Sequence, residues 1–319
     1  MYDVDFTMHA EHRQALMQKF EKLDKEDAKD CCAIILDGGD ELSVYDTDTC
    51  HAFRQESFFQ YLFGVREPGC RGFIDLQRKE SVLLVPQHSA EWELWCGKRT
   101  SLESFRSHYG VDEVHYIDET ADILLGRDIK LLYRLCGVNS DSGLTTSTTS
   151  EFPGISKFRL NDTVLHQELV ECRVIKTEKE LDLMRYVNQL SSDAHIQVMK
   201  VIKPAMFEFH AESEFLHYCY SQGGARLHAY TCICGSGNNA ATLHYGHAGA
   251  PNDKKLEPGE VFLNDMGCSL HGYASDITCT FPTSGVFSSD QRASTYSSFF
   301  LCHCLIAYKT SLRRSSQIS

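Results

Sequence analysis

The sequence lacks any excess of positive charge. Its 319 residues contain 31 Lys and Arg against 44 Asp and Glu, which gives a formal net charge of -13 at pH 7. Partners rich in phosphate are held mainly by Lys and Arg. The balance therefore predicts neither a nucleic acid nor an anionic membrane surface as the partner, and only a local basic patch could override that expectation.

Long apolar stretches are absent as well. No run of eighteen apolar residues occurs, and the first thirty residues contain no apolar core of signal-peptide length. We therefore predict no membrane association and a cytoplasmic location. The 14 cysteines are scattered through an acidic chain rather than spaced as a compact disulfide scaffold, which favours reduced thiols.

The residues that are present have the composition of a globular protein with room for two domains, with 42% hydrophobic and 24% charged residues. In the first half, short apolar runs alternate with segments of helical period, which predicts an α/β arrangement. The predicted strands are 32–36, 72–76 and 81–86, and the predicted helices are 11–29 and 102–109.

A stretch rich in Ser, Thr and Gly, residues 139–157, predicts a long loop with a domain boundary soon after it. Thr177 followed by Glu180 forms a capping box, which predicts the start of a long helix reaching about residue 202. A second helix is predicted at 208–222, and strands are predicted at 230–234, near 261 and near 273.

Two acidic residues, Asp265 and Asp276, lie in the otherwise apolar segment VFLNDMGCSLHGYASDITCTF, which predicts two strands around a turn. If the antiparallel pairing centres between Leu270 and His271, the two aspartates are opposite partners with Cβ atoms about 4.5–5.5 Å apart. At that distance two carboxylates repel by roughly 3 kcal/mol at an effective dielectric near 20. The hairpin then needs a cation, a shared proton or open water, and a divalent metal is the simplest of these.

A structural alternative is that both aspartates are solvated, since Asp is common in loops and on exposed strand faces. The flanking residues favour the metal site, because a buried carboxylate pair without a partner costs several kcal/mol. These apolar neighbours are Val261, Phe262, Leu263, Met266, Ile277 and Phe281.

Longer blocks of the chain resemble the prolidase family, the Xaa-Pro dipeptidases among the pita-bread metallopeptidases. The resemblance runs almost continuously from Ala33 to Ala293. It implies an α/β creatinase-like or aminopeptidase-P-like N-terminal domain at 1–172 and the first half of an α+β pita-bread metallopeptidase domain at 173–293. The blocks that carry it are ILDGGDELSVYDTDT, FRQESFFQYLFGVREPGCRGFIDL, GISKF, VECRVIKTEKEL, YTCICGSGNNAATLHYGHAGAPND and FLNDMGCSLHGYASDITCTFP.

The resemblance implies metal-dependent hydrolysis of Xaa-Pro dipeptides with two Mn²⁺ ions, held in the family by two aspartates, one histidine and two glutamates. Asp265 stands where the family's first aspartate binds one ion, and Asp276 stands where the second bridges both. Carboxylate and imidazole ligands with open water positions suit manganese. Two ions about 3.5–4 Å apart can share a hydroxide nucleophile and hold the scissile carbonyl oxygen.

Two further residues match functional positions of the family. His244 matches a catalytic, substrate-binding histidine that contacts the substrate carbonyl and stabilises the tetrahedral intermediate. Tyr230 matches a tyrosine near the metal and is assigned to substrate binding. The structural alternatives are a turn histidine beside Tyr245 and a core tyrosine in a strand. His247 lies in the same block and is assigned a structural role.

The resemblance stops after Ala293. Residues 294–319 do not match the family, no Glu follows Glu260, and His303 is the one histidine of this tail. The family histidine ligand and both glutamate ligands have no counterpart, so the resemblance implies a C-terminally truncated member that binds metal weakly and is inactive alone. It also implies an exposed edge and apolar face on the hairpin.

Two alternatives to an active enzyme stay open. Members of the family are usually dimers, so this chain could be a homodimer or a non-catalytic dimer partner of a full-length prolidase. A zinc-binding module could instead use Cys232, Cys234, His244 and His247, because CxC followed by HxxH offers four suitable ligands.

Overall fold

The computed structural model describes residues 2–23, 31–146 and 150–295. These form two compact units, an N-terminal unit of residues 3–182 and a C-terminal unit that begins at Leu183 and includes Tyr2. The division falls inside helix α7 (Glu178–Val201), whereas the boundary expected after residue 172 precedes that helix. Most of the non-matching tail, including His303, lies outside the described residues.

The N-terminal unit is built on a six-stranded mixed sheet of order β4-β3-β2-β1-β5-β6. The central strand β1 runs antiparallel to β2 and parallel to β5. The three strands predicted in this half are confirmed as β1, β2 and β3. The strands are β1 Cys32–Asp37, β2 Arg71–Asp75, β3 Glu80–Val85, β4 Glu113–Tyr116, β5 Leu131–Arg134 and β6 Arg159–Asn161.

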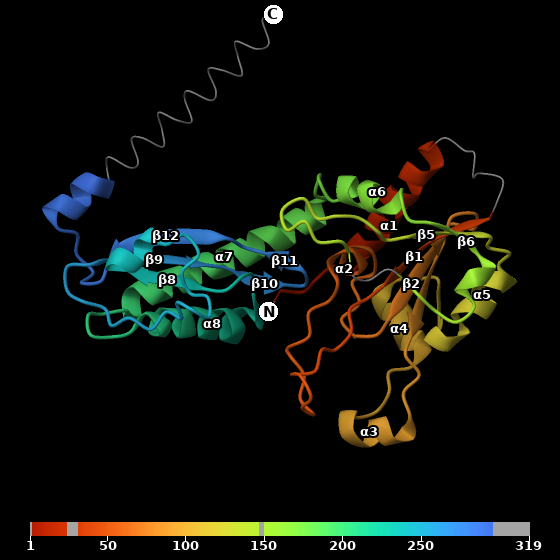
Figure 1. Ribbon diagram of the computed structural model, residues 1–319, viewed down its shortest axis with the longest axis horizontal. Helices are drawn as coiled ribbons and strands as arrows, with labels where there is room; N and C mark the ends of the chain where they lie inside the picture. Colours follow the sequence, from red (N-terminus) through yellow and green to blue (C-terminus); the bar gives the residue numbers. More distant parts are fainter. Residues whose placement is uncertain (1, 24–30, 147–149, 296–319) are drawn as a thin grey trace, which may run out of the picture. The chain divides into compact units, whose positions relative to one another are not determined.

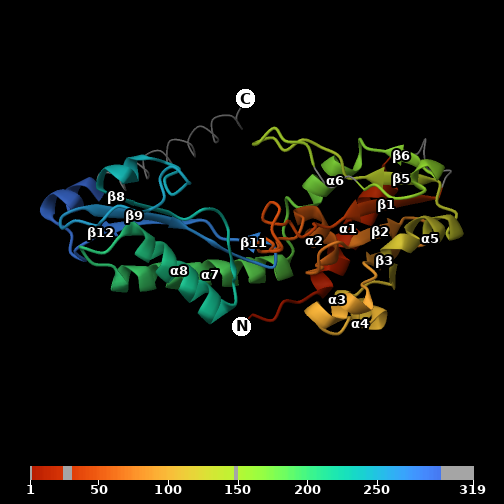
Figure 2. The same cartoon turned by 60° about the horizontal axis from the view of Figure 1, so that its bottom comes forward.

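Helices cover both faces of this sheet (Figures 1 and 2). Ile34 and Leu36 of β1 pack in one core with Leu16 of α1, while Ile35 packs in a second core with Leu124 of α5. Burial on both faces explains why β1 is apolar throughout rather than alternating. The helices are α1 Thr7–Lys22, α2 Ser57–Phe63, α3 Ala90–Cys96, α4 Leu102–Tyr109, α5 Thr120–Gly126 and α6 Leu165–Cys172, with short 3-10 turns at Ile117–Glu119 and Ile155–Lys157.

In the C-terminal unit, α7 and α8 (Glu208–Gly223) lie along one face of the sheet β12-β9-β8 (Figures 1 and 2). The predicted capping box is confirmed, because the Thr177 backbone N–H donates to Glu180 Oε2 at 2.8 Å and the Glu180 N–H donates to Thr177 Oγ1 at 3.3 Å. The strands are β7 Leu227–His228, β8 Ile233–Ser236, β9 Val261–Met266, β10 Cys268–Leu270, β11 Tyr273–Ala274 and β12 Ile277–Pro282, and a 3-10 turn spans Gly237–Ala241.

The hairpin register differs from the prediction. The turn residues are His271 and Gly272, both with positive φ (50° and 83°), and Leu270 pairs with Tyr273. Such a two-residue turn is the primed type that matches strand twist. Asp265 therefore lies opposite Thr278, and the expectation that it faces Asp276 directly is wrong. The observed register differs from the predicted one by two residues. Because side chains alternate between the two faces with a period of two, both aspartates still lie on the same face of the hairpin.

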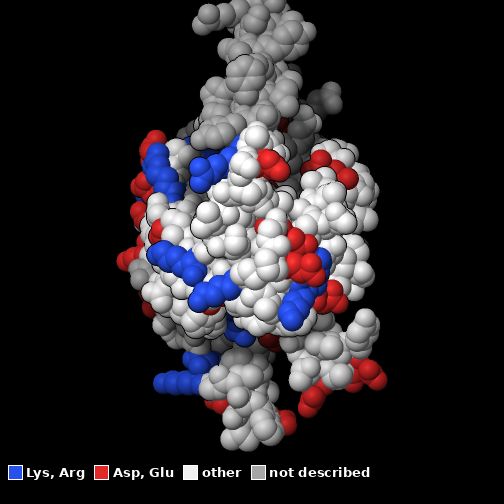
Figure 3. All heavy atoms as spheres, turned by 90° about the vertical axis from the view of Figure 1, so that its left-hand side faces the viewer, with Lys and Arg blue, Asp and Glu red and all other residues white. Residues whose placement is uncertain are grey.

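The structure supplies three further observations. On the face seen in Figure 3, the Lys and Arg side chains of the described residues are interspersed with Asp and Glu and separated by uncharged residues. Within the described part of the chain, no helix combines the length and apolar character that would let it cross a membrane. The described cysteines are all free thiols.

Candidate metal centre

Two carboxylates converge on one phenol hydroxyl in the C-terminal unit. The Tyr230 hydroxyl lies within hydrogen-bond reach of Asp265 Oδ1 and is 3.0 Å from Asp276 Oδ1. The structure thus brings together three of the four residues predicted for the site. Asp265 is half-buried but Asp276 is exposed, so the expectation that apolar neighbours shield both acids is wrong for Asp276.

The alternation of β9 explains why Asp265 faces away from the helices. Phe262, Asn264 and Met266 are buried. Cys279, opposite Asn264 on β12, has its Sγ 3.1 Å from Nδ1 of His195 on α7, which places this buried face against the helices. Asp265, one residue out of phase, therefore lies on the other face of the sheet.

A backbone contact holds Tyr230 near the acids. The Ala229 N–H donates to the Gly267 carbonyl at 2.8 Å, where the chain passes from the sheet containing β7 to the sheet containing β8. The strand predicted at 230–234 consequently begins only at Ile233, which pairs with Asp265. Residues 229–232 connect the two sheets, so Tyr230 is not part of a β-strand. Its side chain therefore reaches the aspartates.

The electrostatics of the site favour an added cation. Burial, together with the hydrogen bond to Asp265, raises the pKa of the Tyr230 hydroxyl, so it stays a protonated donor. One hydroxyl hydrogen cannot fully satisfy two carboxylates, and each carboxylate has several lone-pair sites. Lone pairs on both acids therefore remain for another donor or for a metal ion.

His244 lies apart from this arrangement. It is exposed in the turns that follow the 3-10 helix, and within the described part of the chain it makes no hydrogen bond or ion pair. His247 is also exposed, and its Nδ1 accepts from the Gly249 N–H at 3.0 Å, which is a local turn contact. The substrate-binding role of His244 remains a prediction.

The predicted zinc module is wrong for the described residues, in which no group of three or more His, Cys, Asp and Glu side chains could hold a metal ion. Cys232 and Cys234 are buried, whereas His244 and His247 are exposed. Burial raises the pKa of the Cys232 thiol to about 12 and also raises that of Cys234. These thiols are core side chains rather than ready zinc ligands.

The prolidase resemblance implies manganese rather than zinc. At Asp265 and Asp276 the described residues supply two carboxylates, which suit a hard oxygen-binding ion such as Mn²⁺. Two carboxylates fit part of a dinuclear site, and water or further ligands would have to complete it.

Sequence reasoning missed the residue that anchors the His244 segment. Glu208, at the start of α8, is fully buried. Its carboxylate accepts from the Ser236 N–H at 2.7 Å, from Tyr245 Oη at 2.7 Å and from the Lys254 N–H at 3.2 Å. The sequence shows an acidic residue in the first turn of a predicted helix. Its hydrogen-bond partners lie on loops, and no local pattern predicts that these loops pack against Glu208.

The chain matches two family models. Residues 9–130 match the N-terminal domain of aminopeptidase P, and residues 182–298 match metallopeptidase family M24. Together with the α/β unit and the carboxylate-bearing sheet, these matches define a two-domain metallopeptidase architecture. Residues 182–298 form part of a metallopeptidase family M24 domain, and the predicted fold class is confirmed: an aminopeptidase-P-like N-terminal domain followed by part of a pita-bread domain.

The more particular resemblance to prolidases is also confirmed. The Xaa-Pro dipeptidases of Homo sapiens and Rattus norvegicus are each 50% identical to this chain over 290 residues, which is 91% of this chain and 58% of the relative. A Xaa-Pro aminopeptidase of Haemophilus influenzae is 31% identical over 252 residues, 77% of this chain and 56% of the relative. The chain thus spans somewhat more than half the length of these curated relatives.

Solved structures share the fold. Pseudomonas aeruginosa aminopeptidase PepP has a TM-score of 0.74 at 30% identity, covering 92% of this chain and 65% of that chain. Escherichia coli aminopeptidase P with the inhibitor Pro-Leu has a TM-score of 0.73 at 25% identity, covering 91% of this chain and 65% of that chain.

Proposed function

We propose that the chain serves metal-dependent hydrolysis of Xaa-Pro dipeptides, with Asp265 and Asp276 as metal ligands. The observation that carries the proposal is the convergence of both carboxylates on the Tyr230 hydroxyl. The similarity to Xaa-Pro dipeptidases and the M24 match support the reaction class.

The proposed roles follow from the chemistry of each group. Asp265 and Asp276 would hold the Mn²⁺ ions through their carboxylates. The ions would polarise the scissile carbonyl and lower the pKa of a bound water. Tyr230 would orient the carboxylates and line the substrate site, since its protonated hydroxyl donates toward them. His244, exposed and without a partner in the described part of the chain, would donate to the substrate carbonyl oxygen.

The two carboxylates are fewer than the five ligands that the family resemblance implies. We propose that a polypeptide of these 319 residues binds Mn²⁺ weakly and by itself does not sustain dipeptide hydrolysis. A Gly-Pro hydrolysis assay in excess Mn²⁺ measures this directly, and turnover at a rate typical of enzymes would contradict it.

Removing one carboxylate should weaken Mn²⁺ binding at least about tenfold, because a charge-assisted contact contributes roughly 1.5–3 kcal/mol. The variants are Asp265→Asn and Asp276→Asn, and free Mn²⁺ is followed by electron paramagnetic resonance during titration. Asp290→Asn, which changes an exposed acid of the same unit, is the matched control. If both site variants bind Mn²⁺ as the unchanged chain does, or if the unchanged chain binds none at millimolar concentration, the ligand assignment fails.

A specific surface favours the second candidate function, a non-catalytic partner in a dimer. Helix α3 buries none of its side chains, and Leu94 and Trp95 are 82% and 81% exposed. Trp92, the other aromatic residue of α3, is less available for a partner, because it stacks on His88 with ring centroids 3.9 Å apart. Exposed apolar side chains of this size are typical of interaction surfaces, where Trp often carries much of the binding energy.

The dimer proposal predicts that Trp95→Ser weakens self-association, or association with a full-length prolidase, by roughly thirtyfold, the effect of a 2 kcal/mol hot spot. Analytical ultracentrifugation and a tagged pull-down with full-length enzyme measure the two cases. Tyr45→Ser is the control, since Tyr45 of the same unit is 93% exposed. A chain that stays monomeric and captures no full-length enzyme would rule the proposal out.

A further inference from the structure

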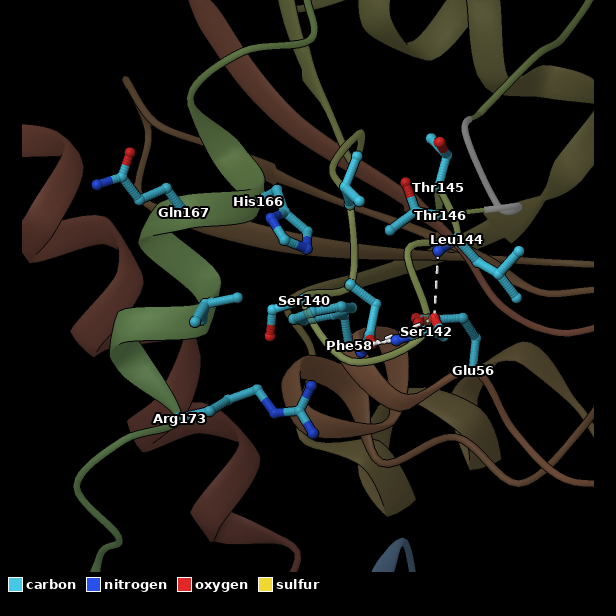
Figure 4. A pocket seen from close by; sticks show the side chains of 13 residues that line it. Glu56, Phe58, Ser140, Ser142, Leu144, Thr145, Thr146, His166, Gln167 and Arg173 are labelled. Atoms are coloured by element: carbon cyan, nitrogen blue, oxygen red, sulfur yellow. Dashed lines mark hydrogen bonds between the residues drawn. The ribbon is translucent and has the colours of Figure 1, made fainter.

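A cavity of about 620 Å³ lies within the N-terminal unit, between helix α6 and the segment 138–146. None of its lining residues belongs to the metal site. Its volume is in the range of small-molecule pockets, roughly 300–1,000 Å³. In Figure 4, His166 and Arg173 project from α6 toward this segment, with Ser140 facing them.

The cavity carries one acid and one base that form no ion pair with each other among the residues that the structure describes. Glu56 and Arg173 both line it and both are half-buried. Within the described part of the chain, neither side chain forms an ion pair, and the Arg173 guanidinium donates only a long 3.4 Å hydrogen bond to Ser57 Oγ. Glu56 Oε2 accepts from the Phe59 N–H at 2.7 Å, which fixes the carboxylate in place.

The base is held by stacking rather than by a carboxylate. The Arg173 guanidinium lies over the Phe58 ring, 4.7 Å from its centroid. His166 meets the same ring edge-on, with centroids 5.5 Å apart. The His166 ring itself rests on Gly137, where an added Cβ would come within 2.1 Å of the ring. Phe58 therefore forms a fixed floor that presents Arg173 with N–H donors still available.

The Glu56 carboxylate is partly shielded from solvent. Burial raises the pKa of the Glu56 carboxyl, and the backbone N–H groups of Phe59, Phe58 and Ser57 together with the charge of Arg173 only partly offset that effect. A cation in the cavity would replace the lost hydration. Apolar side chains surround the charges, because Val138, Leu144 and Val170 line the cavity although each is exposed to solvent.

We propose that this cavity binds a small zwitterion of the α-amino-acid class. The ligand carboxylate pairs with Arg173, its ammonium group pairs with Glu56, and an apolar side chain packs on Phe58 and Val170. Arg173 and Glu56 place two opposite, partly desolvated charges in one cavity. They match a ligand whose carboxylate and ammonium groups are bonded to the same carbon atom. The assignment is independent of the proposed peptidase function.

Calorimetric titration of the full chain with L-leucine tests the proposal. We expect saturable binding that weakens at least about tenfold for N-acetyl-L-leucine, which lacks the ammonium group, and for L-leucinamide, which lacks the carboxylate. Glu56→Gln keeps an oxygen for the Phe59 N–H and should weaken leucine binding while leaving binding of N-acetyl-L-leucine unchanged. Arg173→Gln should weaken leucine binding and leave L-leucinamide unchanged.

Two glycine-to-alanine variants distinguish an effect on leucine binding from an effect on folding. Gly137→Ala should abolish leucine binding by displacing His166, whereas Gly126→Ala, with nothing within 4 Å of its added Cβ, should bind as the unchanged chain does. Melting temperatures identify any variant that fails to fold, and the ligand series on the unchanged chain does not depend on the variants. The proposal is overturned if leucine shows no saturable binding at millimolar concentration, if the two derivatives bind as well as leucine, or if folded Glu56→Gln and Arg173→Gln both keep the original Kd.

Discussion

Replacing Gly267 with alanine will destabilise the C-terminal unit by about 3 kcal/mol and abolish the Mn²⁺ binding proposed for the two aspartates. An added Cβ would lie 1.8 Å from the backbone oxygen of Ser275 and 2.7 Å from its carbonyl carbon. Gly267 joins β9 to β10, and Ser275 directly precedes Asp276. Relief of the clash must therefore move one aspartate relative to the other.

The neighbour of Gly267 cannot easily shift. The Ser275 N–H donates to the Cys268 carbonyl at 3.0 Å, and Ser275 Oγ accepts from the Cys268 N–H at 3.1 Å. The same hydroxyl lies 2.6 Å from Ser191 Oγ of α7. The backbone of Ser275 is thus tied to β10 and its hydroxyl to the helix, and the clashing atoms are backbone atoms, so the strain is not absorbed by a flexible side chain.

Urea denaturation and Mn²⁺ titration of Gly267→Ala measure the two effects. Gly126→Ala is the matched control, because an added Cβ there meets nothing within 4 Å and a helical alanine is slightly favourable. Wild-type stability together with wild-type Mn²⁺ affinity in Gly267→Ala would show that the hairpin does not hold the aspartates as described.

Replacing Glu208 with alanine will destabilise the same unit by about 4 kcal/mol, since several buried donors then lose their acceptor at roughly 1–3 kcal/mol each. Besides the three contacts already described, the carboxylate accepts from Ser236 Oγ at 2.8 Å and from Asn239 Nδ2 at 3.2 Å. The donors come from β8, the 3-10 turn and the segment before β9, so a single carboxylate joins α8 to three parts of the chain.

Amide hydrogen exchange distinguishes this network from ordinary packing. In Glu208→Ala the amides of Ser236 and Lys254 should lose protection, because both donate to the missing carboxylate. Tyr245→Phe removes one donor but leaves the carboxylate with its others, and should cost only about 1 kcal/mol. Equal losses of stability in the two variants would argue against a shared network centred on Glu208.

Local patterns predicted the N-terminal half well. Strands β1, β2 and β3 lie where apolar runs predicted them, because a sheet covered on both faces requires continuous apolar residues. Helix α1 begins at Thr7, four residues before the predicted start at 11, since Met8 and His9 are buried although they break the simple apolar period. Burial there comes from tertiary contacts, including the 2.9 Å contact of His9 Nδ1 with the Tyr61 carbonyl.

The hairpin shows where pattern reasoning ends. Alternation predicted which face each aspartate occupies, and that face is unaffected by a two-residue shift. It could not predict the register, because the turn conformation at His271 and Gly272 decides which residues pair. The exposure of Asp276 was missed for a related reason: it precedes the first paired residue of β12, Ile277, so apolar neighbours in sequence do not enclose it.

The sequence by itself determined the α/β first half, the capped helix α7, the prolidase resemblance and the two aspartates as candidate metal ligands, because periodicity, capping and matched blocks are properties of residues close together along the chain. Only the tertiary structure decided that Tyr230 lies between those aspartates, 35 and 46 residues away along the chain. The same holds for the burial of Glu208 beneath the His244 segment and for the cavity beside Arg173. Such contacts depend on how sheets, helices and loops pack, and packing brings together residues that no local pattern links.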